Sequence, residues 1–272
     1  MGDRQSRPWI VSEELWSLVE PLLAKPGPKK AEDRPRVPDR QALPGNLFAL
    51  HTGIQWEYLP QELGFGSGTT CWRPVAAWNE AGVWDRLHQL LLNELRSKNR
   101  LDWERAVIDS SHVRAARQGP KAGFSPVDRA GPGSKHHLIV DGQGIPLAVS
   151  LTVGNCNDVT QLVPLLDKIP AVAGQVARPR RRPAALLADR GYDHDKYRRL
   201  LWQRGIRPVI ARRGEPHGTG LGIFRYVVER TIAWLHGFRR LRIRWERRDD
   251  LHEAFLGLAV CLITHRHVRR LC

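Results

Sequence analysis

Hydrophobic residues recur at helical spacing through the first hundred positions of the chain. In residues 12–23, Leu15, Leu18 and Leu22 fall on one face, and Ser12 stands where a helix cap is expected. Similar patterns cover residues 40–53, 71–82 and 83–97, while the segment 25–38 is rich in proline and charge. We therefore predict that residues 1–100 form a small all-helical N-terminal domain.

The pattern changes to strands after residue 100. Residues 106–115 begin with a short β-like run, and residues 136–153 form a hairpin pattern with Asp141 and Gly142 at the turn. Short apolar strands at 184–188 and 206–211 alternate with helical patterns at 159–169, 194–205, 223–239 and 251–267. This order predicts an α/β fold for residues 101–272, a ribonuclease H-like mixed five-stranded sheet with flanking helices.

Two prolines lie inside helices that the pattern predicts. Pro44 and Pro74 each remove a backbone donor, and a proline costs about 3 kcal/mol in a helix interior. We expect either that a helix breaks at these positions or that this copy of the protein is partly degenerate.

Composition and charge narrow the class of protein. The chain has 272 residues, 42% of them hydrophobic, which is globular rather than disordered. The 43 basic residues exceed the 28 acidic ones, so the net charge is +15, and a polyanionic partner such as nucleic acid is favoured. The alternative is an ordinary basic protein from a genome whose codons favour arginine.

Cysteines and apolar runs indicate the compartment. The four cysteines lack the spacing of a zinc site and suit a reducing cytoplasm. The first ten residues lack the apolar stretch of a signal peptide, and the longest apolar run, residues 254–264, is too short to span a bilayer. We expect a cytoplasmic protein with no membrane partner.

Three acidic residues occupy special places in the predicted order of elements. Asp109 lies in the first strand, Asp189 ends the fourth strand, and Glu229 lies within a long helix. An acid in an apolar strand is costly unless it is paired or binds a metal, and strand ends are where ligands bind in α/β sheets. Carboxylates of this kind hold hard cations, and two such cations can activate a nucleophile and stabilise the leaving oxygen of a phosphodiester.

Each acid alone also has a structural explanation. Asp109 could cap the Ser110–Ser111 turn, Asp189 could pair with Arg190, and Glu229 could pair along a helix surface. The combination of the three is more specific than any one of them.

The motifs around these acids resemble bacterial insertion-sequence DDE transposases of the IS-four/IS-five group. The matching segments are VIDSSHVRA, GSKHHLIVD, IPLAVSLT, NCND, ADRGYD, YVVERTIAWLHGFRRLRIRWERR and, earlier, TGIQWEYLP, TCWR and EAGVWDRL. The resemblance implies that Asp109, Asp189 and Glu229 are the catalytic, metal-binding triad, with Mg²⁺ or Mn²⁺ as cofactor. It also implies that residues 101–272 are the catalytic domain and that residues 1–100 bind DNA ends through a helix-turn-helix-like unit.

The chain departs from the broader group in its signature around the glutamate, Tyr-x2-Arg-x3-Glu-x6-Lys. Arg225 and Glu229 fit this pattern, whereas Gly222 stands in the tyrosine position and His236 in the lysine position. The DNA contacts that those two residues make in relatives are therefore not expected here.

Arginine clusters near the acids are candidates for DNA binding, because guanidinium groups neutralise phosphates. The alternative is a solvated basic face, and for the histidines a buried pair. The candidate residues are Arg178, Arg180, Arg181, Arg182, Arg225, Arg230, Arg239, Arg240, Arg242 and Arg244, together with Lys135 and His136 at the start of the second strand.

The leading hypothesis is a DNA transposase that cleaves DNA and transfers the strand of an insertion sequence. It would bind transposon ends and target DNA as a homodimer or higher oligomer in the bacterial cytoplasm, associated with the nucleoid. The alternatives are a ribonuclease H-like nuclease without strand transfer and a catalytically inactive DNA-binding regulator derived from a transposase.

Overall fold

A computed structural model describes residues 7–24, 37–175, 178–214 and 221–272, and the side chains of 221–224 are not described. Most of the segment 25–38, which we expected to be a linker, lies outside these ranges. None of the described helices is both long enough and apolar enough to cross a bilayer.

The described residues before position 100 are helical, as the spacing predicts. Ser12 caps the first helix by accepting a hydrogen bond from the N–H of Leu15 at 3.2 Å. Ser67 caps the helix that contains Cys71. The elements are α1 (Glu13–Val19), η1 (Glu20–Leu22), α2 (Asp39–Thr52), η2 (Trp56–Tyr58), η3 (Gln61–Leu63), α3 (Gly68–Glu80) and α4 (Val83–Ser97).

Both prolines lie within continuous helices, so the expected breaks do not occur. Pro44 is inside α2 and Pro74 is inside α3. Around Pro44, Leu43, Leu47 and Leu50 are fully buried. Burial of this kind is worth about 1.5–3 kcal/mol per leucine, which offsets the cost of the lost backbone hydrogen bond.

The second part of the chain forms a mixed sheet of seven described strands, two more than the five expected. Five of them follow the order β4-β3-β1-β5-β6, antiparallel among β4, β3 and β1 and parallel from β1 to β6. The two others are only two residues long, too short to leave a hydrophobic pattern. The strands are β1 (Arg105–Ala115), β2 (Gly123–Phe124), β3 (Pro132–Asp141), β4 (Pro146–Val153), β5 (Ala185–Ala188), β6 (Arg207–Ile210) and β7 (Ile243–Arg244).

The β3–β4 hairpin turns at Asp141 and Gly142, as predicted. The buried Asp141 carboxylate accepts hydrogen bonds from the backbone N–H groups of Gln143 and Ile145, at 2.9 and 2.8 Å. A third bond, from the N–H of Asp102 at 2.9 Å, ties the turn to the segment before β1.

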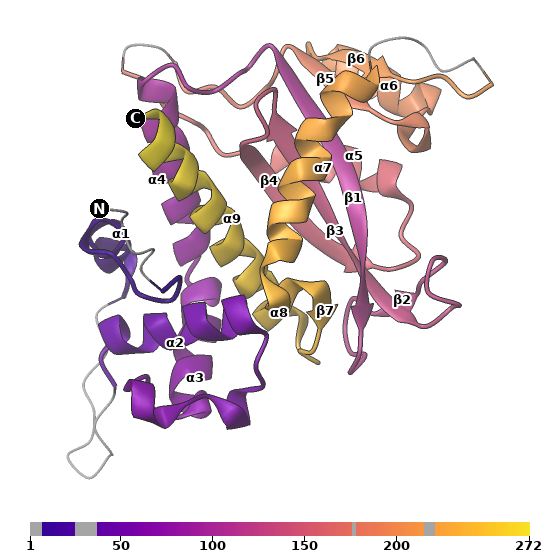
Figure 1. Ribbon diagram of the computed structural model, residues 1–272. Coiled ribbons are helices and arrows are strands. Elements are labelled where there is room, and N and C mark those ends of the chain that lie inside the picture. The colour runs from indigo at the N-terminus through magenta and orange to yellow at the C-terminus, as the bar shows by residue number, and fades with distance from the viewer. Residues whose placement is uncertain (1–6, 25–36, 176–177, 215–220) are drawn as a thin grey trace.

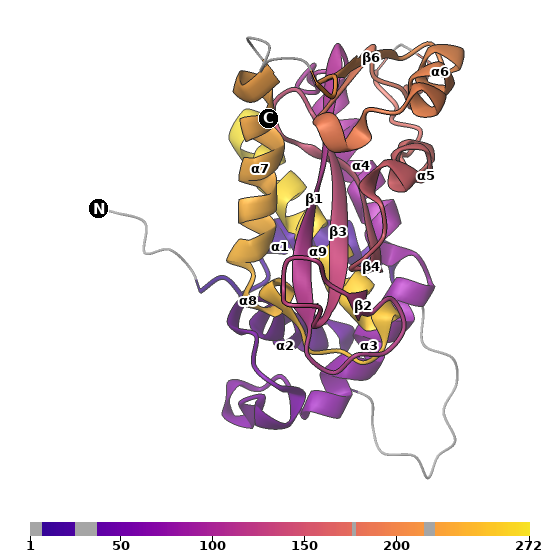
Figure 2. The same cartoon turned by 90° about the vertical axis from the view of Figure 1, so that its right-hand side faces the viewer.

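Helices cover both faces of the sheet. Figure 1 shows α7 crossing the face of β1, and Figure 2 shows α5 and α6 on the opposite side from α7. The remaining elements are η4 (Asp158–Gln161), α5 (Leu162–Asp167), η5 (Arg190–Tyr192), α6 (Asp195–Gln203), α7 (Leu221–Gly237), α8 (Arg239–Arg242) and α9 (Asp249–Leu271).

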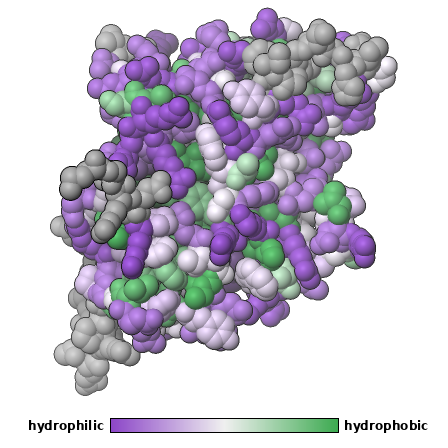
Figure 3. Space-filling model, in the orientation of Figure 1, coloured by the Kyte–Doolittle hydropathy of each residue, from purple (hydrophilic) through white to green (hydrophobic). Residues whose placement is uncertain are grey.

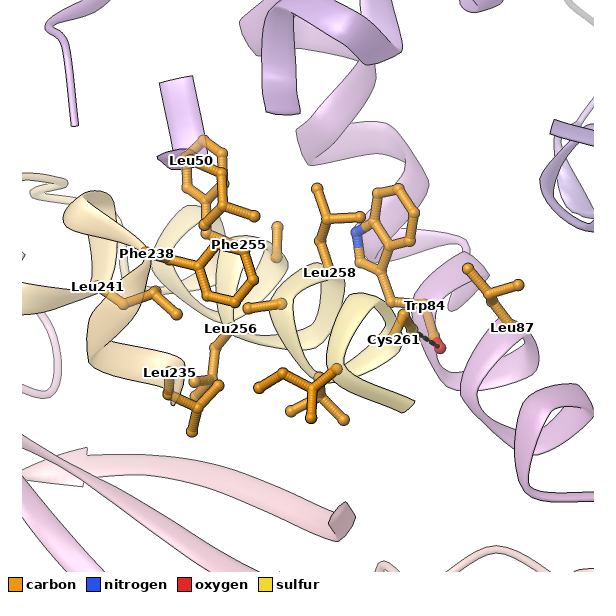
Figure 4. Packing of buried hydrophobic residues seen from close by; sticks show 14 of the residues in the cluster. Leu50, Trp84, Leu87, Leu235, Phe238, Leu241, Phe255, Leu256, Leu258 and Cys261 are labelled. Atoms are coloured by element: carbon orange, nitrogen blue, oxygen red, sulfur yellow. Dashed lines mark hydrogen bonds between the residues drawn. The ribbon is translucent and has the colours of Figure 1, made fainter. Parts of the chain in front are cut away.

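The hydrophobic core on the α7 side of the sheet also includes the N-terminal helices. It joins Leu43 and Trp84 of those helices to Phe255 of α9 and to Val107 and Leu138 of the sheet. Figure 4 shows part of this packing, with the Sγ of Cys261 donating to the carbonyl oxygen of Trp84 at 3.2 Å. The helical part and the sheet therefore share one core.

Candidate active site

The face of β1 that α7 covers carries Asp109. Side chains alternate along a strand, so Asp109 shares this face with Val107, which is buried in the core. The Asp109 side chain is 18% exposed, and its Oδ1 accepts a hydrogen bond from the N–H of Ser110 at 2.8 Å. Asp109 is therefore a partly buried acid that directly follows the buried apolar residues 106–108 of β1.

The register between β1 and β5 brings Asp189 to the same place. Val107 pairs with Leu187 in the parallel ladder, and Asp189 follows two residues later with an extended backbone. Continuing the register by two residues places Asp189 beside Asp109 on the same face. Asp189 also caps η5, because its Oδ1 accepts from the N–H of Gly191 at 2.8 Å.

Helix α7 contributes the third acid together with an arginine that lies between the carboxylates. The Nη2 atom of Arg225 lies 3.5 Å from Oδ2 of Asp109 and 3.4 Å from Oε1 of Glu229. The Glu229 side chain is 56% exposed, so it can change rotamer without disturbing the core. Arg225 thus links the strand and the helix through their acids.

The protonation of Asp109 reflects this neighbourhood. Burial raises the pKa of Asp109, which the N–H of Ser110 and the charge of Arg225 lower, while the charges of Asp189 and Glu229 raise it again. The charges of both other acids therefore act on Asp109. Among the described residues, however, no group of three or more His, Cys, Asp or Glu side chains is already arranged to hold a metal ion.

The donor set nevertheless fits a hard divalent cation. All three side chains offer carboxylate oxygens, the ligands that Mg²⁺ and Mn²⁺ prefer. A cation would also relieve the repulsion from Asp189 and Glu229, which adds to the effect of burial in raising the pKa of Asp109. Asp109 and Asp189 are anchored on the sheet, and the exposed Glu229 can approach them from α7.

A second polar cluster lies on the other face of β1. The Nζ of Lys135 donates to Oδ1 of Asp158 at 2.9 Å and to the carbonyl oxygen of Cys156 at 2.8 Å. The same Asp158 oxygen accepts from the hydroxyl of Ser110 at 2.9 Å. Sequence patterns indicate Asp158 as a helix cap or as a residue that supports the site, and in the structure Asn157 fills the cap.

Tyr192 senses the charges of this cluster and of two of the three acids, Asp109 and Asp189. It is buried, and its hydroxyl makes no hydrogen bond to the described residues. Burial raises the pKa of Tyr192 well above its ordinary value, and the charges of Asp158, Asp109 and Asp189 add to this effect. Nothing in the sequence pattern distinguishes this tyrosine from an ordinary core residue.

Four of the residues expected to bind DNA lie inside the protein, which corrects that prediction for this conformation. Arg240 is 2% exposed and Arg244 is fully buried. Lys135 and His136 are also buried, and Lys135 is occupied by Asp158 and Cys156. A phosphate cannot reach these groups, so each has a structural explanation instead.

Arg240 and His136 belong to one buried polar network that reaches the N-terminal part. The Nε of Arg240 donates to Oε1 of Glu246 at 2.6 Å, and its Nη1 donates to the carbonyl oxygen of Ile54. Nδ1 of His252 lies 3.6 Å from Oε2 of Glu246, and Nε2 of His252 lies 2.8 Å from Nε2 of His136. Burial, together with the charges of His252, His236 and His137, lowers the pKa of His136 well below its ordinary value.

The remaining arginines that we expected to bind DNA are at least partly exposed. Arg178, Arg181, Arg182, Arg239 and Arg242 are exposed, and Arg180, Arg225 and Arg230 are half-buried. Arg230 stacks over the rings of Tyr226 and Trp234, at 5.3 and 4.9 Å from their centroids. Figure 3 shows that the face of Figure 1 is largely hydrophilic with small, separate hydrophobic spots.

The two departures from the signature around Glu229 both lie on α7. His236, in the place of the lysine, has its Nε2 atom 3.3 Å from the hydroxyl of Ser111 on β1. Burial and the charge of Arg242 lower the pKa of His236. Gly222, in the place of the tyrosine, falls among residues 221–224, whose side-chain environment is not described.

Comparison with known proteins gives two family matches and two close relatives. Residues 104–264 match the family described as "Transposase DDE domain", and residues 11–88 match "Putative transposase of IS4/5 family". The "Putative transposase for insertion sequence element IS402" of Burkholderia cepacia is 59% identical over 151 residues, 56% of this chain and 72% of that protein. The "Insertion element IS402 uncharacterized 16.2 kDa protein" of Burkholderia cepacia is 50% identical over 119 residues, 43% of this chain and 81% of that protein.

Solved structures resemble the chain only distantly. The "Crystal structure of the Mos1 Strand Transfer Complex" matches with a TM-score of 0.36 and 13% identity, over 90% of this chain and 79% of that chain. The "Crystal structure of the Mos1 mariner paired end complex with Mn" matches with a TM-score of 0.34 and 12% identity, over 90% and 80%. Similarities this weak carry no structural argument.

Proposed function

Because the chain belongs to the transposase DDE domain family, we propose that Asp109, Asp189 and Glu229 are its catalytic carboxylates. The family match and the relatives confirm the prediction of a DNA transposase from an insertion sequence. The observation that carries the finer proposal is the Arg225 side chain, which joins Asp109 to Glu229 where the register of β5 delivers Asp189.

The three carboxylates would hold Mg²⁺ or Mn²⁺. Bound cations of this kind activate a water or a 3′-hydroxyl as nucleophile and stabilise the leaving oxygen of a phosphodiester. Asp109 and Asp189, fixed on the sheet, set the position of the site, and Glu229 completes it from α7. Arg225 neutralises the acids in the free protein and is placed to meet a phosphate once the acids have other partners.

DNA would reach the acids along the exposed arginines. Arg239 and Arg242 follow α7, and Arg178, Arg181 and Arg182 precede β5, so positive charge flanks the acids in the sequence on both sides. We assign the ribonuclease H-like catalytic role to residues 101–272, and the recognition of transposon ends to residues 1–100. The separate family match over residues 11–88 supports this division. Assembly as a homodimer or higher oligomer on DNA, in the nucleoid of a bacterial cytoplasm, completes the proposal.

Cleavage of DNA that carries the ends flanking the protein's own gene tests the proposal. Asp109→Asn, Asp189→Asn and Glu229→Gln should each lower the cleavage rate with Mg²⁺ or Mn²⁺ by at least about 100-fold, because each removes a ligand from a centre worth several kcal/mol. DNA binding should persist in all three. Asp167→Asn is the matched control, since Asp167 is an exposed acid paired with Arg204 on another face of the chain.

The same assay separates the alternatives. A variant in the triad that cleaves at the parent rate would contradict the assignment of that residue. Cleavage without joining to target DNA would indicate a nuclease without strand transfer, and binding without cleavage would indicate a regulator.

A further inference from the structure

A cavity of about 420 Å³ lies away from the three acids, between η2, α3 and the segment that joins β7 to α9. Figure 1 places β7 and α8 at the opposite end of β1 from β5 and β6. From Asp109 to Ala115, where β7 pairs with β1, the strand runs six residues, or about 20 Å. The cavity is therefore separate from the candidate active site but lies at the end of the same strand.

Three tryptophans line the cavity, and they differ in how they are held. The ring of Trp56 is stacked on the ring of Phe255, with centroids 5.7 Å apart. Trp72 carries the guanidinium of Arg248 at 5.3 Å from its ring centroid. Trp245 is 36% exposed, so its ring is open to a ligand. Indole rings in a cavity of this size offer stacking surfaces for another flat ring.

The charge of the lining is positive. Arg117 and Arg247 are exposed, and no ion pair of either side chain occurs among the described residues. Glu246, the buried acid of the lining, is compensated by Arg240 at 2.6 Å. Its other oxygen, Oε2, makes no hydrogen bond to the described residues, and Nδ1 of His252 lies 3.6 Å away. The cavity thus combines aromatic walls with two arginines, Arg117 and Arg247, that form no ion pair among the described residues.

We propose that this cavity binds a single unstacked nucleotide of DNA, with its base against Trp72 and Trp245 and its phosphate on Arg117 and Arg247. Stacking on aromatic side chains recognises any base, while arginine supplies the countercharge for the backbone. This inference rests on the proposed function only because it takes DNA as the ligand. It adds a second DNA contact, about 20 Å from the proposed site of cleavage.

The experiment measures affinity, in the presence of a chelator, for two short duplexes that differ by one extra unpaired cytosine. The full-length parent should prefer the duplex with the unpaired base by roughly 10-fold, which corresponds to one good stacking contact. Trp245→Ala and Trp72→Ala should remove this preference and leave affinity for the paired duplex unchanged, while Trp245→Phe should retain it. Arg247→Ala should weaken binding to both duplexes and reduce the salt dependence.

Trp202→Ala is the matched control, because Trp202 on α6 is 59% exposed and lies outside the cavity. It should keep the preference of the parent. Absence of the preference in the parent, or its persistence in both alanine variants, would overturn the proposal. A change of oligomeric state in Trp245→Ala, with no change of preference, would also overturn it and assign the cavity to a second copy of the chain. Each of these results leaves the carboxylate assignment intact, because cleavage is measured separately.

Discussion

Replacing Arg240 by methionine separates a structural arginine from a DNA-binding one. Methionine retains most of the volume of the side chain but leaves Glu246, which is 2% exposed, without its countercharge. The change also removes the bond to the carbonyl oxygen of Ile54 and the cation–π contacts with Trp56 and Phe255, at 5.2 and 5.4 Å. These contacts share one guanidinium, so their energies are not summed.

The expected loss of unfolding free energy is about 3–5 kcal/mol, the cost of leaving one member of a buried ion pair uncompensated. For 272 residues, an unfolding entropy of about 2.1 cal/mol/K per residue gives roughly 0.6 kcal/mol/K for the chain. The melting temperature should therefore fall by roughly 5–9 °C. Thermal unfolding and DNA affinity at several salt concentrations are measured on the same preparations.

Two further variants make the result specific. Arg240→Met combined with Glu246→Leu should recover most of the stability, because no unpaired charge remains in the core. Arg239→Met, at the exposed neighbouring position, should change the unfolding free energy by less than about 0.5 kcal/mol and reduce the salt slope of DNA binding by about 0.9. If Arg240→Met has the melting temperature of the parent and weakens DNA binding as much as Arg239→Met does, then Arg240 contacts DNA and the reasoning from burial is wrong.

Two other predictions concern buried polar groups. The ring of His88 is buried, with its Nε2 atom 2.9 Å from the carbonyl oxygen of Pro146, and burial lowers the pKa of His88 to about 4. As the pH falls from 6.5 to 4, the imidazole of His88 therefore gains a proton in the unfolded chain but not in the folded chain, which destabilises the folded chain. Between pH 6.5 and pH 4, the parent should lose about 3 kcal/mol of unfolding free energy that His88→Gln does not lose. If the unfolding free energies from urea titrations change equally with pH in both proteins, this prediction is refuted. Asp158→Asn should lower the unfolding free energy by about 1–3 kcal/mol, because the buried Lys135 loses its carboxylate partner, whereas Asp167→Asn should not. Equal urea midpoints for Asp158→Asn and the parent would show that Lys135 needs no charged partner.

The three acids could be chosen from the sequence because each stands where the local pattern is informative. Asp109 interrupts an apolar strand, Asp189 ends one, and Glu229 follows Arg225 by four residues, one turn of helix. What the sequence could not provide was the long-range pairing of Asp109 with the same arginine. The two carboxylates that Arg225 contacts are 120 residues apart in the chain, and only the register of the sheet and the path of α7 bring them together.

The arginine-rich segment after α7 shows why charge alone does not identify a surface. Arg240, Arg244 and Glu246 point inward, while Arg239, Arg242 and Trp245 are exposed. A buried arginine requires partners, and those of Arg240 include Ile54 and Trp56, which lie far away in the sequence. The continuous helices through Pro44 and Pro74 have the same explanation, because distant core contacts outweigh a local preference.

The two ends of β1 therefore offer DNA different chemistry. Beyond the residues 105–107 that pair with β5 lie Asp109 and Asp189, two of the proposed catalytic acids, and where β7 pairs with residues 114–115, tryptophans and arginines surround a cavity. Among the described strands, none pairs with the intervening residues of β1 on that edge. At about 3.4 Å per nucleotide step, the roughly 20 Å between Asp109 and Ala115 corresponds to about six phosphates. A DNA strand lying along this edge would place one nucleotide in the cavity while another phosphate meets the acids, so under both proposals a single strand of the sheet sets the distance between the nucleotide contact and the catalytic carboxylates.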